Sequence, residues 1–338
     1  MSDSQNNPVP RNSDPNDDLQ PVPHGIRIPA LPKQRKLSPL FVTGYFVLVA
    51  ITAIGAGFWI FSGPIQRLRI VIWAGQATKL REQGRLVETE QEYRKMLAFD
   101  EQTFGPDDPS ALECRNNLAA ALKEQKKYAE AEQEFRTALA NYQRVLGPQH
   151  PSTLTAWKGL ANTLAAQGKN TEAEQEHRTV LALRERVLGL EHVGTLGSRN
   201  DLANCLRAQH KYAEAEPEYR VVLARRQPAL SPEHPNILEV RSNLAIALDG
   251  QEKNAEAEQE HRAVLAVRER LLGLEHSDVL LGYTHLAASL KAQEKWKEAL
   301  SFARSAEDGF ERTMGSKHPH YLDAKKLREE IESQGGAQ

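Results

Sequence analysis

Five histidines stand at the same position of a repeating pattern, and histidine is the side chain most often found as a metal ligand. They are His150, His192, His234, His276 and His318. A zinc ion needs several ligand atoms about 2.1 Å from it. Equivalent residues of a stacked array lie about 10 Å apart, which is the width of one helix. Because the first copy of the pattern has Asp108 at this position, we expect a role in a turn, and neither a metal site nor another cofactor.

Carboxylates and cysteines are the other candidates for chemistry. Most acidic residues belong to "EAE" runs that recur along the chain, whereas general acid–base catalysis needs one positioned group. The sequence contains no glycine-rich phosphate loop and no nucleophile elbow. Cys114 and Cys205 lie two repeats apart, roughly 20 Å in a stack of helices, and a disulfide allows only about 7 Å between Cα atoms. We therefore expect two buried free thiols, no catalytic residue and no enzyme activity.

The repeating pattern is clearest in "LGPQHPSTL", residues 146–154. Related stretches begin, always 42 residues apart, at Phe104, Leu188, Leu230, Leu272 and Met314. A period without drift is typical of a solenoid in which each repeat is one supersecondary unit. Within one repeat, Pro151 suits a first helical position. The stretch "QGKN", residues 167–170, interrupts the helical spacing of apolar residues with a glycine, so each repeat is predicted to be a helix hairpin.

Leucine and alanine recur at fixed positions of every hairpin, which lets two helices approach closely. These positions hold Leu118, Leu160, Leu202, Leu244 and Leu286; Ala119, Ala161, Ala203, Ala245 and Ala287; Leu122, Leu164, Leu206, Leu248 and Leu290; and Ala131, Ala173, Ala215, Ala257 and Ala299. A further position of the second helix holds Phe135, His177, Tyr219 and His261. We expect these two histidines to be packed rings.

Two polar positions recur with the same regularity. Glutamate and arginine stand four residues apart in Glu132–Arg136, Glu174–Arg178, Glu216–Arg220 and Glu258–Arg262. Such pairs on a helix surface contribute only about 0.3–0.5 kcal/mol each. The first helix of each hairpin is predicted to end at a glutamine: Gln125, Gln167, Gln209, Gln251 and Gln293. We expect this side chain to make a hydrogen bond within the turn.

These residues resemble the tetratricopeptide repeat, and specifically its 42-residue variant found in kinesin light chains and many bacterial repeat proteins. The match follows residues 146–188 along their whole length, and also "YAEAEPEYRVVLARR", residues 212–226. The resemblance covers about residues 63–320 and implies an all-α, right-handed superhelical solenoid. It also implies a concave groove, lined by the first helices, in which peptides bind. Such a scaffold serves many partners, so the motif specifies the fold and not the partner.

Residues that vary along the implied groove are the candidates for recognition. Three positions vary: Asn116, Lys158, Asn200, Ser242 and Thr284; Ala120, Asn162, Asn204, Ile246 and Ala288; and Lys123, Ala165, Arg207, Asp249 and Lys291. Amides can bond an extended main chain, and cations can pair with an acidic side chain or a C-terminal carboxylate. The alternative is a solvated face without a dedicated ligand. The predicted peptide-binding residues are Asn116, Lys158, Asn162, Asn200, Asn204 and Arg207.

The N-terminal part of the chain differs from the repeats. Residues 1–36 are polar and rich in proline, and are predicted to be disordered. Residues 40–61 carry no charge and would form a helix about 33 Å long, enough to cross a bilayer. The basic residues on the two sides of this segment are equal in number, so they do not fix its orientation. A short tail before a first span favours the repeats on the extracytoplasmic side of a bacterial inner membrane.

The sequence therefore predicts a disordered tail, a transmembrane helix and a solenoid over residues 63–334. The expected units are 63–104, 105–146, 147–188, 189–230, 231–272 and 273–314, followed by a capping helix within 315–334. The balance of 43 basic and 45 acidic residues argues against a nucleic-acid partner. The predicted function is a membrane-anchored, non-catalytic scaffold that binds a peptide segment or a partner protein in its groove. The alternative is self-association into a structural array at the membrane.

Overall fold

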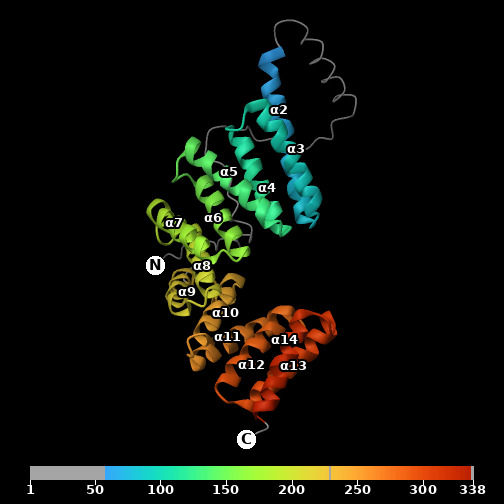
Figure 1. Ribbon diagram of the computed structural model, residues 1–338, viewed down its shortest axis with the longest axis vertical. Helices are drawn as coiled ribbons and strands as arrows, with labels where there is room; N and C mark the ends of the chain where they lie inside the picture. The colour runs from blue at the N-terminus through green and yellow to red at the C-terminus, as the bar shows by residue number, and fades with distance from the viewer. Residues whose placement is uncertain (1–57, 228–229, 336–338) are drawn as a thin grey trace, which may run out of the picture. The chain divides into compact units, whose positions relative to one another are not determined.

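The structure, a computed structural model, describes residues 58–227 and 230–335, which form helices and no strand (Figure 1). The helices are α2 (Phe58–Glu82), α3 (Leu86–Phe104), α4 (Pro109–Glu124), α5 (Tyr128–Leu146), α6 (Pro151–Ala166), α7 (Asn170–Leu188), α8 (Val193–Ala208), α9 (Tyr212–Arg226), α10 (Pro235–Asp249), α11 (Asn254–Leu272), α12 (Ser277–Ala292), α13 (Trp296–Met314) and α14 (Pro319–Gly335). The chain divides into two compact units, residues 1–75 and 76–338. The first is described only over residues 58–75, which belong to α2.

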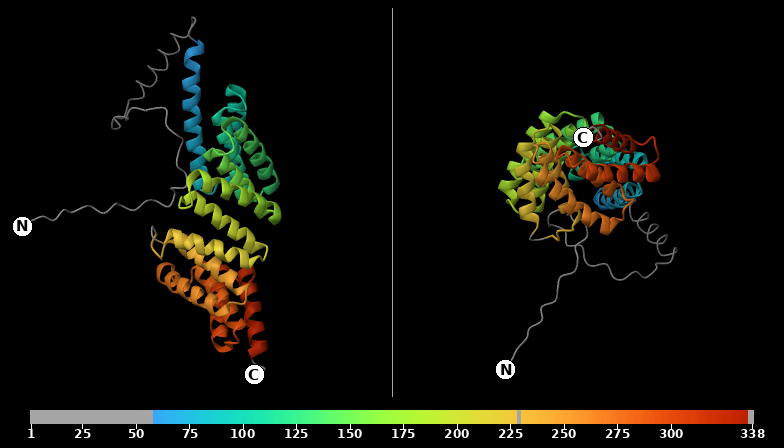
Figure 2. Two further views of the ribbon diagram at one scale, coloured as in Figure 1. Left: turned by 90° about the vertical axis from the view of Figure 1, so that its left-hand side faces the viewer. Right: turned by 90° about the horizontal axis from the view of Figure 1, so that it is seen from below.

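Within residues 76–335 the helices stack in chain order, and each packs on the helix before it and the helix after it (Figure 2). Consecutive hairpins are α4–α5, α6–α7, α8–α9, α10–α11 and α12–α13, and α14 packs on α12 and α13. The first helices also approach one another directly, α4 to α6, α6 to α8 and α8 to α10. The side formed by the first helices is therefore the more closely packed side of the stack, and we call it the inner face.

Each first helix from α4 onward begins at a side-chain cap. The Nδ1 atoms of the five periodic histidines accept a hydrogen bond of 3.0–3.2 Å from the backbone N–H two residues later. Asp108 does the same through its carboxylate to the Ser110 N–H at 2.9 Å. Such a bond satisfies one of the donors that a helix N-terminus leaves unpaired. The predicted turn role of this position is confirmed, because imidazole and carboxylate both supply the acceptor.

The turn inside each hairpin needs one residue in the left-handed conformation, where glycine is favoured. Gly84 and Gly168 occupy it with φ of 71° and 78°. Lys126, His210, Glu252 and Glu294 stand at the equivalent position of the other hairpins, with φ of 59–62°. The following residue closes the turn, as Lys127 N–H does by donating to the Leu122 carbonyl at 2.9 Å.

The turn between hairpins is regular except after α9. Gly105, Gly147, Gly189, Gly273 and Gly315 follow the second helices with φ of 83–94°. Ser231 replaces this glycine after α9. α9 has 15 residues, whereas α5, α7, α11 and α13 have 19. The last residue of this shorter helix is Arg226.

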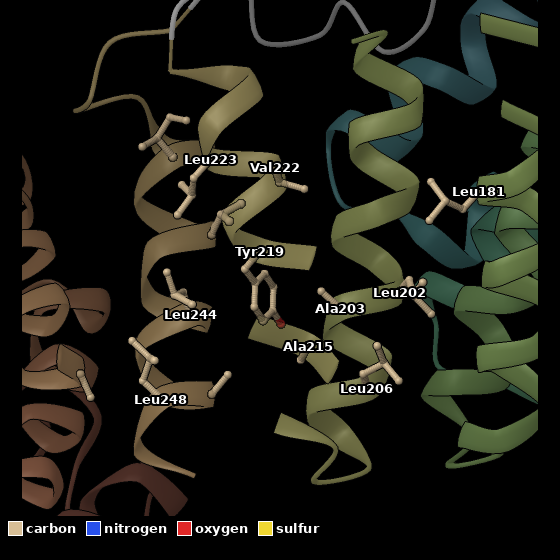
Figure 3. Close-up of a cluster of buried hydrophobic side chains, with 14 residues drawn as sticks. Leu181, Leu202, Ala203, Leu206, Ala215, Tyr219, Val222, Leu223, Leu244 and Leu248 are labelled. Carbon is tan, nitrogen blue, oxygen red and sulfur yellow. The ribbon is translucent and has the colours of Figure 1, made fainter. Parts of the chain in front are cut away.

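The predicted leucine and alanine positions form the core, with at most 4% of any of these side chains exposed. Figure 3 shows one cluster, in which the Tyr219 ring of α9 lies between Leu244 and Leu248 of α10 and Ala203 of α8. Burial of a leucine of this kind contributes roughly 1.5–3 kcal/mol. Because each cluster draws on neighbouring hairpins, one hairpin alone could not bury it.

The predicted N-terminal features lie largely outside the described residues. The expected disordered tail falls wholly there, and so does the predicted transmembrane helix, except for residues 58–61 at the start of α2. Among the described helices, none has both the length and the apolar character needed to cross a membrane.

A single methyl group tests the close approach of α5 and α6. A Cβ added at Gly159 would overlap the ring of Phe135. We expect Gly159→Ala to lower the free energy of unfolding by about 1–3 kcal/mol, because the ring has to move in a packed interface. Gly75→Ala is the control, since nothing lies within 4 Å of its added Cβ. Urea unfolding followed by circular dichroism makes the comparison, and equal midpoints for Gly159→Ala and the wild type would contradict this account.

Candidate binding face

One buried glutamate in each second helix connects two hairpins. These residues are Glu90, Glu132, Glu174, Glu216 and Glu258, whose side chains are 5–13% exposed. Each carboxylate pairs with the arginine four residues later, as predicted for the last four. It also accepts a hydrogen bond of 2.7–2.8 Å from a lysine of the next hairpin: Lys127, Lys169, Lys211, Lys253 or Lys295.

The glutamine that ends each first helix completes this link. We predicted a hydrogen bond within its own turn, but the side chain instead reaches the preceding hairpin. Its Nε2 donates to the buried glutamate of the preceding hairpin at 2.7–2.8 Å. The same Nε2 donates to a backbone carbonyl at the start of the preceding second helix at 3.0–3.3 Å. Gln251 and Gln293 also donate to carbonyls of their own helices. The periodic polar residues therefore join neighbouring hairpins, beyond stabilising each hairpin locally.

The pKa values of these carboxyl groups follow from their partners. Burial alone would raise the pKa of Glu216, but the hydrogen bonds from Lys253, Arg220 and Gln251 outweigh it and lower the pKa to about 2. The corresponding partners of Glu90 also lower its pKa to about 2. Glu132, Glu174 and Glu258 shift in the same direction for the same reasons. The carboxylate form is thus the one that the folded array stabilises.

All six predicted peptide-binding residues lie on the first helices and are half-buried: Asn116, Lys158, Asn162, Asn200, Asn204 and Arg207. Asn116 Oδ1, Asn200 Oδ1 and Arg207 Nε are buried without a hydrogen-bond partner. Buried polar atoms of this kind are rare in folded proteins. The structure thus places unsatisfied hydrogen-bonding groups on α4 and α8.

Charges concentrate where α4, α6 and α8 adjoin. Lys158 Nζ of α6 lies 3.2 Å from Asp201 Oδ2 of α8. Burial lowers the pKa of Lys123 on α4, and the positive charge of Lys158 lowers it further, against the opposite effects of Glu124 and Asp201. Burial lowers the pKa of His177 on α7, on which the charges of Asp201 and Lys158 act in opposite directions. The two lysines stood at the predicted groove positions, whereas Asp201, whose carboxylate pairs with Lys158, was not among the predicted residues.

The middle of the inner face is a hydrogen-bonded network. Asn204 Oδ1 accepts from Tyr219 Oη at 2.7 Å and from Asn243 Nδ2 of the next hairpin at 3.2 Å. Burial raises the pKa of Tyr219 to about 12, although Arg207 beside the phenol opposes this shift. The carbonyl oxygen of Asn204 is thus already engaged, unlike that of Asn200.

A second polar group lies below the inner face near α10 and α12. The His261 ring is buried, as predicted, and its Nε2 lies 2.8 Å from Asp249 Oδ2. The His285 ring lies 5.8 Å from it, centroid to centroid. Burial, reinforced by His261, lowers the pKa of His285 to about 4. Sequence reasoning missed this group, although Asp249 and His285 stand at the same offsets from His261 as Arg207 and Asn243 do from Tyr219.

The remaining candidates for chemistry are buried. Both cysteines are free, as predicted, and burial raises the pKa of each thiol. Cys114 Sγ donates to the Tyr93 carbonyl at 3.2 Å, so its thiol is part of the packing between α3 and α4. Among residues 58–227 and 230–335, no three histidine, cysteine or acidic side chains are grouped so as to hold a metal ion.

We call the contacts of each buried glutamate with the next hairpin a joint. A stack of helix hairpins with a varied inner face and invariant joints defines the class of helical repeat scaffolds. Family models of the tetratricopeptide repeat match residues 69–144, 115–186, 152–227, 195–270 and 279–320. These matches cover more than half of the chain, which therefore belongs to the tetratricopeptide repeat family. No functionally curated protein matches it.

Solved structures identify the type of repeat. A crystal structure described as the nearly identical TPR-like repeats of a putative kinesin light chain from Podosopora anserina is 26% identical. The match covers 61% of this chain and 98% of that one, with a TM-score of 0.54. The protein is thus a tetratricopeptide repeat protein with kinesin-light-chain-like repeats.

Two more distant structures share the fold alone. BtubC (BKLC) from P. vanneervenii is 20% identical, with 69% of this chain and 94% of that chain covered and a TM-score of 0.57. The apo form of RapI is 13% identical, with 78% and 99% covered and a TM-score of 0.55.

The buried glutamate can be tested by removing its charge. We expect Glu216→Gln to lower the free energy of unfolding by about 1–3 kcal/mol, since Lys253 and Arg220 lose a buried charged acceptor. Glu256→Gln removes the exposed carboxylate that pairs with the same Arg220, and should change stability by less than about 1 kcal/mol. Chemical denaturation of both variants measures the contrast, which should disappear if the buried and exposed pairs are equivalent.

Acid should weaken the joints in a defined range. The pKa of Glu216 is about 2 in the folded chain against an ordinary value of 4.5. Its contribution is complete above pH 4.5 and is lost as the pH falls toward 2. We expect urea midpoints to decline over this range, and to decline less in Glu216→Gln. Parallel curves for wild type and variant between pH 5 and pH 3 would show that this carboxylate is not responsible.

Proposed function

We propose that the protein is a membrane-anchored, non-catalytic scaffold that binds an extended peptide segment along its inner face. The observation that supports this proposal best is the set of buried, unpartnered polar atoms on Asn116, Asn200 and Arg207. Leaving such atoms unpaired costs about 1–3 kcal/mol each. These three residues are half-buried, and a peptide main chain, which carries donors and acceptors in alternation, would satisfy such groups once the side chain turns toward it.

The chemistry of the inner face fits a segment held by its backbone and selected by its charge. Asparagine can both donate to and accept from a peptide unit. Lys158 and Arg207 add cations that can pair with an acidic side chain or a terminal carboxylate. Asn204 is a weaker candidate than Asn200, since its carbonyl oxygen already accepts two hydrogen bonds within the array.

The exposed charges of the second helices, in contrast, are the same in successive hairpins. Arg94, Arg136, Arg178, Arg220 and Arg262 each pair with an exposed glutamate of the next hairpin: Glu130, Glu172, Glu214, Glu256 and Glu298. This regular alternation of charge recurs in every repeat. The predicted recognition positions, by contrast, differ from one repeat to the next and lie on the first helices, as expected for a surface that selects a partner.

Peptide binding can be tested with ligands selected from a random peptide display library on the full-length protein in detergent. We expect Asn200→Ala to weaken these ligands about tenfold, which corresponds to the loss of one hydrogen bond of about 1.4 kcal/mol. Gln175→Ala, an exposed position of α7, is the control. Fluorescence anisotropy gives both affinities. Unchanged affinity in Asn200→Ala, with the circular dichroism spectrum intact, would reject the inner face as the binding surface.

Membrane anchoring through residues 40–61 is part of the same proposal, and its support is the uncharged sequence of that segment. We expect the protein to remain with the membrane fraction in carbonate and to be released by detergent. Protease added to intact spheroplasts should digest the repeats if they lie outside the inner membrane. Protection until lysis would place them in the cytoplasm, and release without detergent would refute the anchor.

A further inference from the structure

We propose that the array contains an acid-sensitive device, because five of its helices begin at a histidine that can accept its capping hydrogen bond only while the ring is neutral. The capping residues before α6, α8, α10, α12 and α14 are His150, His192, His234, His276 and His318. A fall in pH through the interval in which imidazole gains a proton would loosen these helix starts together. This property belongs to the fold of the array and does not depend on what its inner face binds.

The bond at each cap requires the neutral ring. Nδ1 accepts from the backbone N–H two residues later, over 3.0–3.2 Å in the five caps. A neutral imidazole has one acceptor nitrogen, whereas both nitrogens of the charged ring are donors. A proton that Nδ1 takes up from water therefore removes the acceptor, and the N–H group at the helix start loses its side-chain partner.

The charge that the ring gains acts in the same direction. The N–H groups of a helix start carry a partial positive charge, so a cation placed there is destabilising. Proton uptake thus costs the folded chain a hydrogen bond and adds a repulsion, whereas the unfolded chain has neither to lose. The free energy of unfolding therefore falls as the pH falls through the interval between about 8 and 5 in which histidine changes its charge.

The acidic residues near the caps already have partners. Glutamates directly precede three of the histidines, but each of them is bound by an arginine of the same hairpin: Glu191 by Arg225, Glu233 by Arg270 and Glu275 by Arg312. Among the described histidines, only the His261 ring pairs with a carboxylate. A proton gained by a capping ring is therefore not balanced by a carboxylate bound to that ring.

The other charged neighbours are cationic or can become so. Arg184 Nη1 donates to the backbone carbonyl two residues after His192, at 2.8 Å. The His320 ring lies 5.1 Å from the His318 ring, centroid to centroid, and Lys317 directly precedes His318. These groups add to the repulsion that a charged His192 or His318 ring would meet.

One position of the series resists acid. Asp108 caps α4 in the same way, and its carboxylate accepts from the Ser110 N–H at 2.9 Å. A carboxylate remains an acceptor over the whole interval in which histidine becomes a donor. The chain therefore contains an acid-resistant version of the cap, with which the histidine caps can be compared.

Two other sets of groups respond to acid and have to be separated from the caps. The joints weaken below pH 4.5, under the interval of the caps. Burial and the neighbouring His261 lower the pKa of His285 to about 4 from 6.5, so its contribution to stability is lost as the pH falls from 6.5 toward 4. Burial also lowers the pKa of His177. Variants that differ only at the caps keep all these groups, so comparing them isolates the caps.

A leucine four residues after each cap reports on the helix start, because its N–H closes the first turn by donating to the carbonyl of the capping residue. This bond is 3.0 Å both for Leu196 after His192 and for Leu112 after Asp108. Amide exchange is measured by NMR on the full-length protein, labelled with 15N-leucine, in detergent at pH 7.5 and pH 5.5. Rates are corrected for the pH dependence of intrinsic exchange.

We expect protection at pH 5.5 to fall less than about twofold at Leu112, and at least about fivefold after the histidine caps, at Leu154, Leu196, Leu238, Leu280 and Leu322. Equal losses of protection at Leu112 and at these five leucines would overturn the proposal.

Replacement of the histidines by aspartate tests the cause. The fivefold variant combines His150→Asp, His192→Asp, His234→Asp, His276→Asp and His318→Asp. The control is His210→Asn, which removes an exposed histidine that caps no helix and puts asparagine at a φ of 59° that asparagine tolerates. Thermal unfolding of each protein is followed by circular dichroism between pH 7.5 and pH 5.5 at constant ionic strength.

We expect the Tm of the wild type and of His210→Asn to fall by at least about 5 °C over this range, and that of the fivefold variant by less than half as much. His276→Asp alone should restore the protection of Leu280 at pH 5.5 and leave that of Leu196 low. A fivefold variant whose Tm depends on pH as in the wild type would refute the proposal. If this variant does not fold, the amide exchange of the wild type and of His276→Asp still decides. None of these measurements involves a peptide, so their outcome is separate from that of the proposed function.

Discussion

The array depends on one buried carboxylate per joint. A charged group taken out of water is strongly destabilising unless its partners surround it. Glu174, for example, is 5% exposed and is bound by Arg178 of its own helix and by Gln209 and Lys211 of the next hairpin. Removing the next hairpin would leave this carboxylate with Arg178 alone as a charged partner. Each hairpin therefore needs its neighbour both for polar contacts and for the shared leucine core. These two sets of contacts together determine the spacing of the first helices.

That spacing determines what the inner face can do. Rigid joints hold α4, α6 and α8 close enough for side chains of successive first helices to meet, as Lys158 and Asp201 do. The ring position of the second helices then varies together with the residue 24 positions later. Phe135 packs on Gly159, Tyr219 and Asn243 both donate to Asn204, and the His261 and His285 rings lie 5.8 Å apart. Constant joints and variable contacts between first helices give one fold many distinct surfaces, which is the property that a binding scaffold needs.

Much of the fold was predictable because it repeats. The leucine and alanine positions recur in five repeats, the proline of Pro151 in four, and the capping role of His150 in six, so local physics and periodicity agree. The bridging role of Gln209 could not be predicted from one hairpin, since its acceptors lie 35 and 39 residues earlier. The recurrence of glutamate, glutamine and lysine at fixed offsets was the feature of the sequence that indicated this bridging role. The group of His261, Asp249 and His285 occurs once, and a single occurrence gives periodicity nothing to detect.

The central claim is that the buried glutamate couples two hairpins directly. A double-mutant cycle on Glu216 and Lys253, with glutamine and methionine as replacements, measures this coupling. We predict a coupling free energy of about 1–3 kcal/mol that persists at high salt, because Glu216 is largely buried and its carboxylate is 2.7 Å from Lys253 Nζ. A coupling free energy near zero, with each single variant folded, would show that the joint is held by apolar packing alone and would contradict the account.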